Sequence, residues 1–171
     1  MTQIMPKQSV KWVFDTVVIS NFIFSDALDL LQQRYKNKAL ITSEVYGELV
    51  VGMEKYPKLK EIDALFIDDS FELVTLSREE IKHCQQLLTS LDLGEASAIT
   101  YAKTRQYIVV SDDRAARYHC TNVDIPVTGT IGVLKACVQD QQLVLEDADI
   151  ILEKMIAEGF YSPIKSIAHI M

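Results

Sequence analysis

The stretch YIVVSDDRAARYHC (residues 107–120) contains the clearest strand of the chain and the polar residues that follow it. Tyr107–Ser111 is short, apolar and rich in β-branched residues, which is typical of a strand buried on both faces of a sheet. Two acids, Asp112 and Asp113, follow at once, and Arg114–Cys120 has a helical pattern. A strand that passes directly into a helix is the repeating unit of parallel α/β sheets.

The same order recurs along the chain. Val10–Phe14 is a second apolar run, and it is ended by Asp15. Further short strands are expected at Ala39–Ile41, Phe71–Leu76 and Ile125–Val127. Helices are expected at Phe22–Tyr35, Glu44–Met53, Pro57–Phe66, Ser77–Leu91, Glu95–Arg105, Ile131–Val138, Leu143–Ala157 and, from Ser162 and Pro163 onward, in the segment SPIKSIAHI (162–170). Strands that alternate with helices predict an α/β fold with a mostly parallel sheet.

Length and composition limit the function classes. The 171 residues predict one domain over residues 1–171, and the 49% of apolar residues exclude a disordered chain. The formal net charge is −7, so binding to nucleic acid has to come from a local patch. The three cysteines form no CxxC pair, which predicts buried thiols in a reducing compartment.

The N-terminal stretch MTQIMPKQSVKWVFD has no long apolar segment followed by small residues, so we expect no secretory signal. No run approaches the roughly 18 apolar residues of a membrane span. The sequence therefore predicts a cytoplasmic protein that does not associate with a membrane.

Three acids follow predicted strands directly: Asp15 after the first, and Asp112 and Asp113 after YIVVS. Ligands of open α/β sheets bind outside the carboxyl ends of the strands, so these acids are expected to share one site. Helix capping is the alternative for each of them. Asp15 and Asp112 precede predicted helices, and Asp113 would then lie in a first turn, where the helix dipole favours negative charge.

Glu95 is harder to explain by local structure alone. It forms a D-x-x-E capping-box pattern with Asp92, but it also lies on a helix face that is otherwise apolar. A carboxylate facing a core is costly unless it is paired, and a bound cation would satisfy it. Glu44 and Glu48 share one side of another predicted helix, and at least one of them is expected to point at the same sheet edge.

Clustered carboxylates favour Mg²⁺ or Mn²⁺ over zinc, because these ions prefer hard oxygen ligands. The chain has three histidines and no HExxH or paired-cysteine zinc pattern. Its sequence contains no GxGxxG, GxxxxGK[ST] or GxSxG motif, which argues against nucleotide cradling and acyl transfer. An acidic site with divalent ions suits displacement at phosphorus.

With these residues in view, the chain resembles PIN-domain ribonucleases, in particular the GEA-motif, single-domain prokaryotic subgroup related to VapC-like toxins. The resemblance covers nearly the whole chain in order. It is carried by FDTVVISNFIFSDALDLL (14–31), ITSEVYGELVVG (41–52), LDLGEASAITYA (91–102), YIVVSDDRAARYHC (107–120) and IPVTGTIGVLKAC (125–137). The implied fold is a three-layer α/β domain, with a four- or five-stranded, mostly parallel sheet between helices.

The resemblance implies a Mg²⁺- or Mn²⁺-dependent endoribonuclease, a hydrolase of phosphodiester bonds. The implied catalytic residues are Asp15, Glu48, Glu95, Asp112 and Asp113. The first four would hold the metal, and Asp113 would support them. In the second motif the acid falls on Glu48 and not on Glu44.

Hydroxyls and arginines complete the implied site. Thr16 stands at a motif position, and Ser111 and Thr130 would orient carboxylates or water, with local helix capping as their alternative role. Arg114 and Arg117 would contact substrate phosphate or pair with the acids. Val17 departs from the family pattern, which often has a small polar residue there.

The resemblance further implies a small antitoxin protein as partner, and a homodimer. Two alternatives to the nuclease remain. One is a module that binds nucleic acid or protein without turnover. The other is a phosphatase-like domain with an acceptor aspartate, but this needs a second acid close after Asp15, and the following Thr-Val-Val supplies none.

Overall fold

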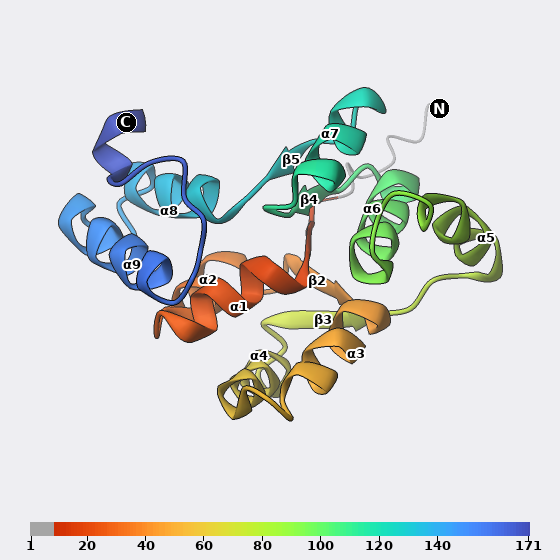
Figure 1. Cartoon of the computed structure of the whole chain (residues 1–171), viewed down its shortest axis with the longest axis horizontal. Coiled ribbons are helices and arrows are strands. Elements are labelled where there is room, and N and C mark those ends of the chain that lie inside the picture. Colours follow the sequence, from red (N-terminus) through yellow and green to blue (C-terminus); the bar gives the residue numbers. More distant parts are fainter. Residues whose placement is uncertain (1–8) are drawn as a thin grey trace, which may run out of the picture.

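A parallel sheet forms the centre of the protein, with helices on both of its faces (Figure 1). The computed structural model describes residues 9–171. The strands are Trp12–Phe14 (β1), Ala39–Thr42 (β2), Phe71–Val74 (β3), Ile108–Val110 (β4) and Val127–Thr128 (β5). They lie in the order β3-β2-β1-β4-β5, and every neighbouring pair is parallel. The predicted α/β fold with a parallel sheet is confirmed.

The strand order places a switch point between β1 and β4. From β1 the chain builds β2 and β3 on one side, then crosses back and builds β4 and β5 on the other. The two central strands are in register, with Phe14 beside Val110. Ligands of open α/β sheets bind beyond the carboxyl ends of the strands at such a point, so the residues that follow Phe14 and Val110 lie where a site is expected.

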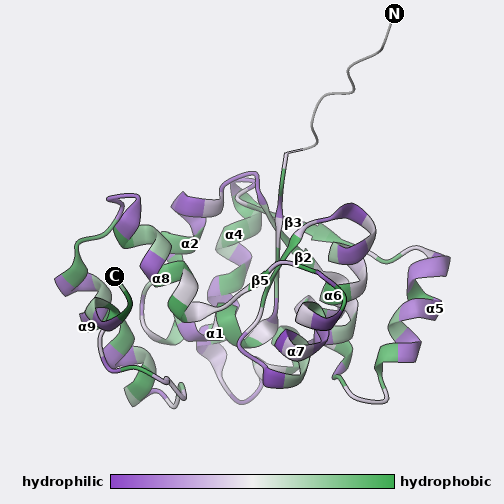
Figure 2. Cartoon of the chain, turned by 90° about the horizontal axis from the view of Figure 1, so that it is seen from above, coloured by the Kyte–Doolittle hydropathy of each residue, from purple (hydrophilic) through white to green (hydrophobic). Residues whose placement is uncertain are grey.

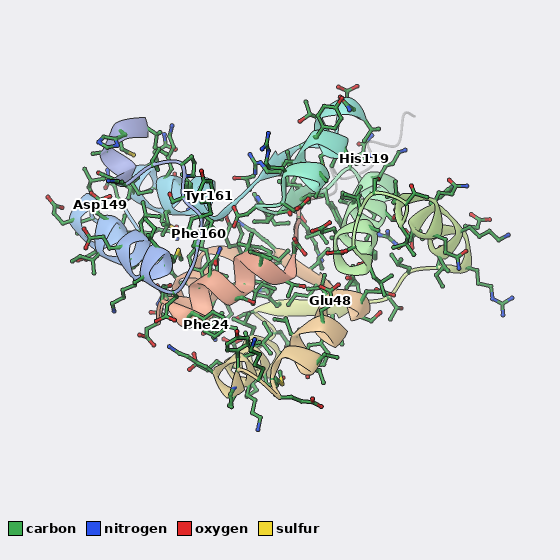
Figure 3. The ribbon with its side chains drawn as sticks, in the orientation of Figure 1. Phe24, Glu48, His119, Asp149, Phe160 and Tyr161 are labelled. Carbon is green, nitrogen blue, oxygen red and sulfur yellow. The ribbon has the colours of Figure 1, made fainter. Side chains whose placement is uncertain are left out.

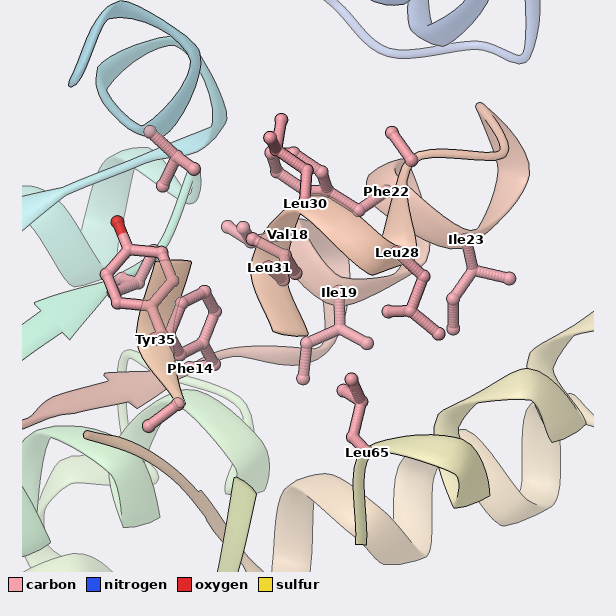
Figure 4. Close-up of a cluster of buried hydrophobic side chains, with 14 of the residues drawn as sticks. Phe14, Val18, Ile19, Phe22, Ile23, Leu28, Leu30, Leu31, Tyr35 and Leu65 are labelled. Carbon is pink, nitrogen blue, oxygen red and sulfur yellow. The ribbon is translucent and has the colours of Figure 1, made fainter. Parts of the chain in front are cut away.

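One face of the sheet carries most of the helices. These are Thr16–Phe24 (α1), Leu28–Tyr35 (α2), Ser43–Gly52 (α3), Ala64–Ile67 (α4), Thr130–Gln139 (α8) and Leu145–Ala157 (α9), with 3-10 helices at Pro57–Asp63 and Ile167–Ile170. Phe14 and Val110 point into their core. In Figure 4 Phe14 lies beside Tyr35, their ring centroids are 5.1 Å apart, and side chains of α1 and α2 surround them.

Arg78–Leu87 (α5), Leu93–Arg105 (α6) and Arg114–Asn122 (α7) cover the opposite face. Val13, Leu40 and Val109 alternate with the residues of the first core and point into this second one. Figure 2 shows the hydrophobic strands enclosed between the helices, while α5 and α7 carry hydrophilic residues outward. The central strands β1, β2 and β4 therefore bury both of their faces, as their apolar sequences predict, whereas the edge strands β3 and β5 are partly exposed.

The predicted helix Phe22–Tyr35 is wrong in its start and in its continuity. Helix α1 begins at Thr16, where the Asp15 side chain caps it, and ends at Phe24. The chain then turns through Asp26, whose φ of 60° no helix can contain, before α2 begins at Leu28. The start of α1 could not be predicted from the apolar residues after Asp15, because the periodicity of a short apolar run does not distinguish a buried helix from a strand.

Two further helix predictions need correction. Pro57–Phe66 is a 3-10 helix followed by the short α4, and not one α-helix. In the C-terminal segment only Ile167–Ile170 is helical, and Ser166, not Ser162 or Pro163, stands at its start. Asp149 of α9, labelled in Figure 3, accepts hydrogen bonds from the Ser166 hydroxyl (2.8 Å) and the Ile167 N–H (2.6 Å). The Ser166 hydroxyl also accepts the Ala168 N–H at 3.1 Å, so this local cap and the tertiary contact with Asp149 together fix the start of the helix.

The three cysteines, Cys84, Cys120 and Cys137, are buried free thiols, as predicted. Within residues 9–171, no helix has the length and apolar character that crossing a membrane requires. The first eight residues, part of the stretch on which the absence of a secretory signal rests, lie outside the described residues, so that expectation stays a prediction.

Candidate functional site

The carboxyl edge of β1 and β4 gathers the acids singled out in the sequence. Asp15 leaves β1, and Ser111, Asp112 and Asp113 leave the neighbouring β4. The helices α3 and α6 bring further carboxylates to the same edge from segments far away in the sequence. The site is therefore built at the switch point of the sheet.

Asp15 is the most deeply buried of these acids, with 2% of its surface exposed. Its Oδ1 accepts the Thr16 N–H at 2.7 Å, and its Oδ2 accepts the Ser111 hydroxyl at 2.9 Å. Burial raises the pKa of Asp15 to about 6, and the negative charges of Glu48 and Asp113 add to the shift. The Asp15 carboxylate is thus both held in place and destabilised as an anion.

Glu48 joins three helices. Its Oε2 accepts the Thr16 hydroxyl of α1 at 2.6 Å, and its Oε1 accepts the Gly94 N–H of α6 at 2.9 Å. Figure 3 shows Glu48 on the side of α3 that faces these two helices. Of the two acids on α3, Glu48 is therefore the one at this edge, whereas the Glu44 carboxylate accepts the neighbouring Ser43 hydroxyl.

Gly94 leaves room for the Glu48 carboxylate. A Cβ at position 94 would lie 2.5 Å from Glu48 Oε2. A Gly94→Ala variant is expected to push the Glu48 side chain out and to break its charge-assisted hydrogen bonds, at a cost of about 1–3 kcal/mol in the free energy of unfolding. Urea unfolding measures this cost.

Gly47→Ala is the matched control for that variant. Gly47 lies in α3, and a Cβ there would meet nothing within 4 Å. This variant is expected to gain up to about 1 kcal/mol, because alanine favours a helix over glycine. Equal stability of the two variants would contradict the role given to Gly94.

Glu95 lies in the first turn of α6, within reach of the charges of the other acids. Its Oε2 accepts the Asp92 N–H at 3.2 Å, so the predicted capping interaction is present. Burial, together with the negative charges of Asp113, Asp15 and Asp92, raises the pKa of Glu95 to about 7. Local capping therefore does not explain Glu95 fully, because its carboxylate remains in a repulsive field.

Asp113, and not Asp112, caps the helix after β4. The Asp113 Oδ1 accepts the Ala116 N–H at 2.8 Å, and its own N–H donates to the Ser111 hydroxyl. The expectation that Asp112 stands at the cap and Asp113 in the first turn is therefore wrong. Asp113 is also the residue at this strand end whose charge raises the pKa of both Asp15 and Glu95.

Asp112 is turned toward the start of α8. It accepts the Thr130 N–H at 2.8 Å, the Thr130 hydroxyl at 2.5 Å and the Asn21 side-chain amide at 3.2 Å. Burial raises the pKa of Asp112, and the Thr130 hydrogen bonds and the positive charge of Arg117 oppose that shift. Asp112 thus anchors the loop after β4 to α1 and α8.

The three hydroxyls named from the sequence each touch one acid. Thr16 donates to Glu48, Ser111 to Asp15, and Thr130 to Asp112. Helix α8 has Gly129 at its cap position, so capping is not the role of Thr130. Sequence reasoning missed Asn21, which donates to both Asp112 and Thr130. The sequence feature that could have pointed to Asn21 is its polar amide within the otherwise largely apolar helix α1.

The two arginines of α7 differ in their surroundings. Arg117 donates to the Ser111 carbonyl at 3.0 Å, and its positive charge attracts the Asp112 carboxylate. Its side chain therefore holds the loop after β4 in place. Arg114 is exposed on the first turn of the helix. Val17 is also exposed, and no carboxylate here depends on a side-chain donor at that position.

The donor set fits a hard divalent cation. Within residues 9–171 no three His, Cys, Asp or Glu side chains converge closely enough to form a ready ligand cage. Mg²⁺ does not need one, because it keeps several waters and is usually bound through one or two carboxylates. Burial and the neighbouring negative charges raise the pKa of Asp15 and Glu95, and a divalent ion bound here would favour their ionised forms.

Fold and site together define a parallel α/β domain with a carboxylate-lined edge at its switch point. The sequence model of the PIN domain matches residues 11–171, and the chain belongs to this family. PIN domains are generally nucleases, and they generally use divalent metal ions.

No curated protein matches the chain. Thirteen chains of solved structures do. Among them is a toxin-antitoxin complex from Klebsiella pneumoniae, with 19% sequence identity and a TM-score of 0.46. The similarity covers 61% of this chain and 87% of that one.

Proposed function

We propose that the protein is a Mg²⁺- or Mn²⁺-dependent endoribonuclease that hydrolyses phosphodiester bonds at the carboxyl edge of β1 and β4. The observation that carries the proposal is the gathering of carboxylates at the switch point of a PIN domain, where burial and neighbouring negative charges raise the pKa of Asp15 and Glu95. A fold that only needed helix caps would gain nothing from buried carboxylates with raised pKa values.

We assign the cation to the edge that Asp15, Glu95 and Asp113 share, where one or two of these carboxylates would bind it directly and waters would complete its coordination. This differs from the ligand set that the family resemblance implies, in which Asp112 binds the metal and Asp113 supports it. The charge of Asp113 raises the pKa of both Asp15 and Glu95, so Asp113 faces the other acids, whereas the Asp112 carboxylate is turned toward Thr130 and Asn21. Asp112 then serves as a positioning residue.

A bound divalent ion would polarise the phosphoryl oxygen and activate a water for attack. The chain's own residues fix where this happens. Ser111 and Thr16 hold the carboxylates of Asp15 and Glu48, which limits their movement when substrate arrives. Arg114, exposed at the start of α7, is placed to meet a phosphate of the RNA, while Arg117 holds the loop.

The test is cleavage of end-labelled single-stranded RNA by the purified chain. We expect products with Mn²⁺ or Mg²⁺ and none after chelation by EDTA, with single-stranded DNA of the same sequence as the comparison substrate. An Asp15→Asn variant purified in parallel controls for contaminating nucleases. Equal cleavage by the variant and the wild type would refute the assignment.

The alternative is a PIN-like module that binds RNA or a protein without turnover. Tight RNA binding with no products across several divalent ions would favour it. The toxin role, with a small antitoxin protein as partner, and the homodimer stay predictions from the family resemblance. Co-purification of the product of a small neighbouring gene, and the mass of the protein in solution, test them.

A further inference from the structure

A pocket outside the acidic edge lies between α5, α6 and α7. It is a cavity of about 350 Å³, and helices from three segments line it. This volume is at the lower end of the range for small-ligand sites. The lining residues are His83, Gln86, Leu87, Ile99, Thr100, Lys103, Thr104 and His119.

The pocket combines an apolar floor with groups that attract anions. Leu87 and Ile99 supply the floor, Lys103 supplies an ammonium group, and His83 and His119 supply imidazole rings. None of the described lining residues is acidic, in a chain whose net charge is −7. A ligand with a flat apolar part and a negative charge matches this lining.

Thr100 contributes a buried hydroxyl to the lining of the pocket. Only 3% of its surface is exposed, and within the described residues its hydroxyl has no hydrogen-bond partner of standard geometry. The hydroxyl lies near the Cys84 thiol, which is a weak hydrogen-bonding group. A buried unsatisfied hydroxyl is costly, and a polar atom of a ligand in this pocket would satisfy it.

The pocket and the acidic edge lie along the same pair of helices. Both α6 and α7 begin at the acidic edge, with Glu95 and Asp113, and both run toward the pocket. Ile99 and Lys103 follow Glu95 at intervals of four residues, so they lie roughly 6 and 12 Å further along the helix. At a stacked spacing of about 3.4 Å, this is two to four nucleotides along one strand. Figure 3 labels His119 on α7 beside α6.

We propose that this pocket binds one nucleotide of the RNA substrate, which lies two to four nucleotides along the strand from the phosphodiester bond that is cut. Its base packs on Leu87 and Ile99, and Lys103 and the Thr100 hydroxyl contact its phosphate or ribose. The inference rests on the proposed nuclease function and adds a subsite that selects or orients the RNA. An acidic peptide is the competing occupant, and the position beside the catalytic edge favours RNA.

The test follows the histidine side chains by NMR while a short single-stranded RNA of mixed sequence is added in EDTA, where no cleavage occurs. The chain has three histidines, so the signals are readily assigned. His83 and His119 are expected to shift, and His169, in the C-terminal 3-10 helix on the opposite side of Figure 1, is not. Because this readout needs no turnover, it is separate from the cleavage assay. A chain that cleaves RNA while its pocket histidines stay unmoved would overturn the subsite alone.

Two variants give the matched comparison. Lys103→Ala is expected to weaken RNA binding several-fold and to lower the salt dependence by about 0.7 in the log–log slope, the loss of one phosphate contact. Lys82→Ala removes the same charge from α5 outside the pocket and is expected to change neither. Thr100→Val should fold normally, since the hydroxyl has no partner, and should bind RNA more weakly. Equal binding by Lys103→Ala and Lys82→Ala, or histidine shifts with an acidic peptide but not with RNA, would overturn the proposal.

Discussion

An Asp113→Asn variant is expected to lose more than about 100-fold of the RNA-cleavage rate, since even groups that only orient metal ligands are worth about 10–100-fold. It is expected to fold as stably as the wild type or better. Asparagine caps a helix as well as aspartate does, so the bond from the Ala116 N–H survives. Removing the charge also reduces the repulsion on Asp15 and Glu95.

Asp112→Asn is the charge-matched comparison. It removes one negative charge from the same loop, but from a side chain that faces Thr130 and Asn21. We expect it to keep the rise in melting temperature that Mn²⁺ produces, and Asp113→Asn to lose that rise. The opposite result, with the metal response lost at position 112 and kept at 113, would restore Asp112 as the ligand.

Asp112→Ala separates anchoring from metal binding. It leaves the Thr130 N–H and the Thr130 hydroxyl without their acceptor, and each such buried donor costs about 1–3 kcal/mol. The variant is therefore expected to unfold at lower denaturant concentration even in EDTA. Unchanged stability would mean that Asp112 does not anchor the loop.

The strands could be predicted from the sequence because each is a short apolar run between polar residues. The parallel sheet followed from their alternation with helices. The helix boundaries that failed depend on distant contacts or on one unusual backbone angle. The C-terminal 3-10 helix starts where Asp149 holds Ser166, and α1 is separated from α2 by the turn at Asp26.

The acids of the site could also be predicted, because strand ends of a parallel sheet meet at one edge. Which of two adjacent aspartates faces the site could not. The choice depends on Thr130 and Asn21, which lie 18 and 91 residues away from Asp112 in the sequence. The pocket between α5, α6 and α7 could not be predicted from the sequence either, since the pattern of its lining residues is that of ordinary surface helices.

The stability of the metal-free protein is expected to fall as the pH rises from about 4.5 to about 7. In the folded state the pKa of Asp15 is raised from 3.8 to about 6, and that of Glu95 from 4.5 to about 7. The folded state therefore binds more protons than the unfolded state in this window, and stability is lost as these groups ionise. Asp15 alone accounts for about 2–3 kcal/mol at 1.36 kcal/mol per pKa unit, and the more exposed Glu95 contributes less than its shift suggests.

Groups with lowered pKa values do not cancel this trend. The pKa of Glu80 is lowered to about 2 beside Arg105, Ser77 and Thr104, so its stabilising effect is lost only as the pH falls below about 4.5. Asp26 and Asp68 also have lowered pKa values and act in the same acidic range. The window between about pH 4.5 and pH 7 is therefore governed by the acidic edge.

Divalent cations should reverse the pH trend, because a cation binds the ionised carboxylates and competes with protons. Thermal unfolding across this window, in EDTA and in millimolar MgCl₂, measures both curves. The gain from Mg²⁺ is expected to be small near pH 4.5 and to grow toward pH 7. Glu95→Gln keeps the oxygen that accepts the Asp92 N–H, so in EDTA it should match the wild type at the acidic end and exceed it at neutral pH. A wild-type stability in EDTA that rises across the window would show that folding does not destabilise the ionised forms of these carboxylates, and the case for a cation there would fail.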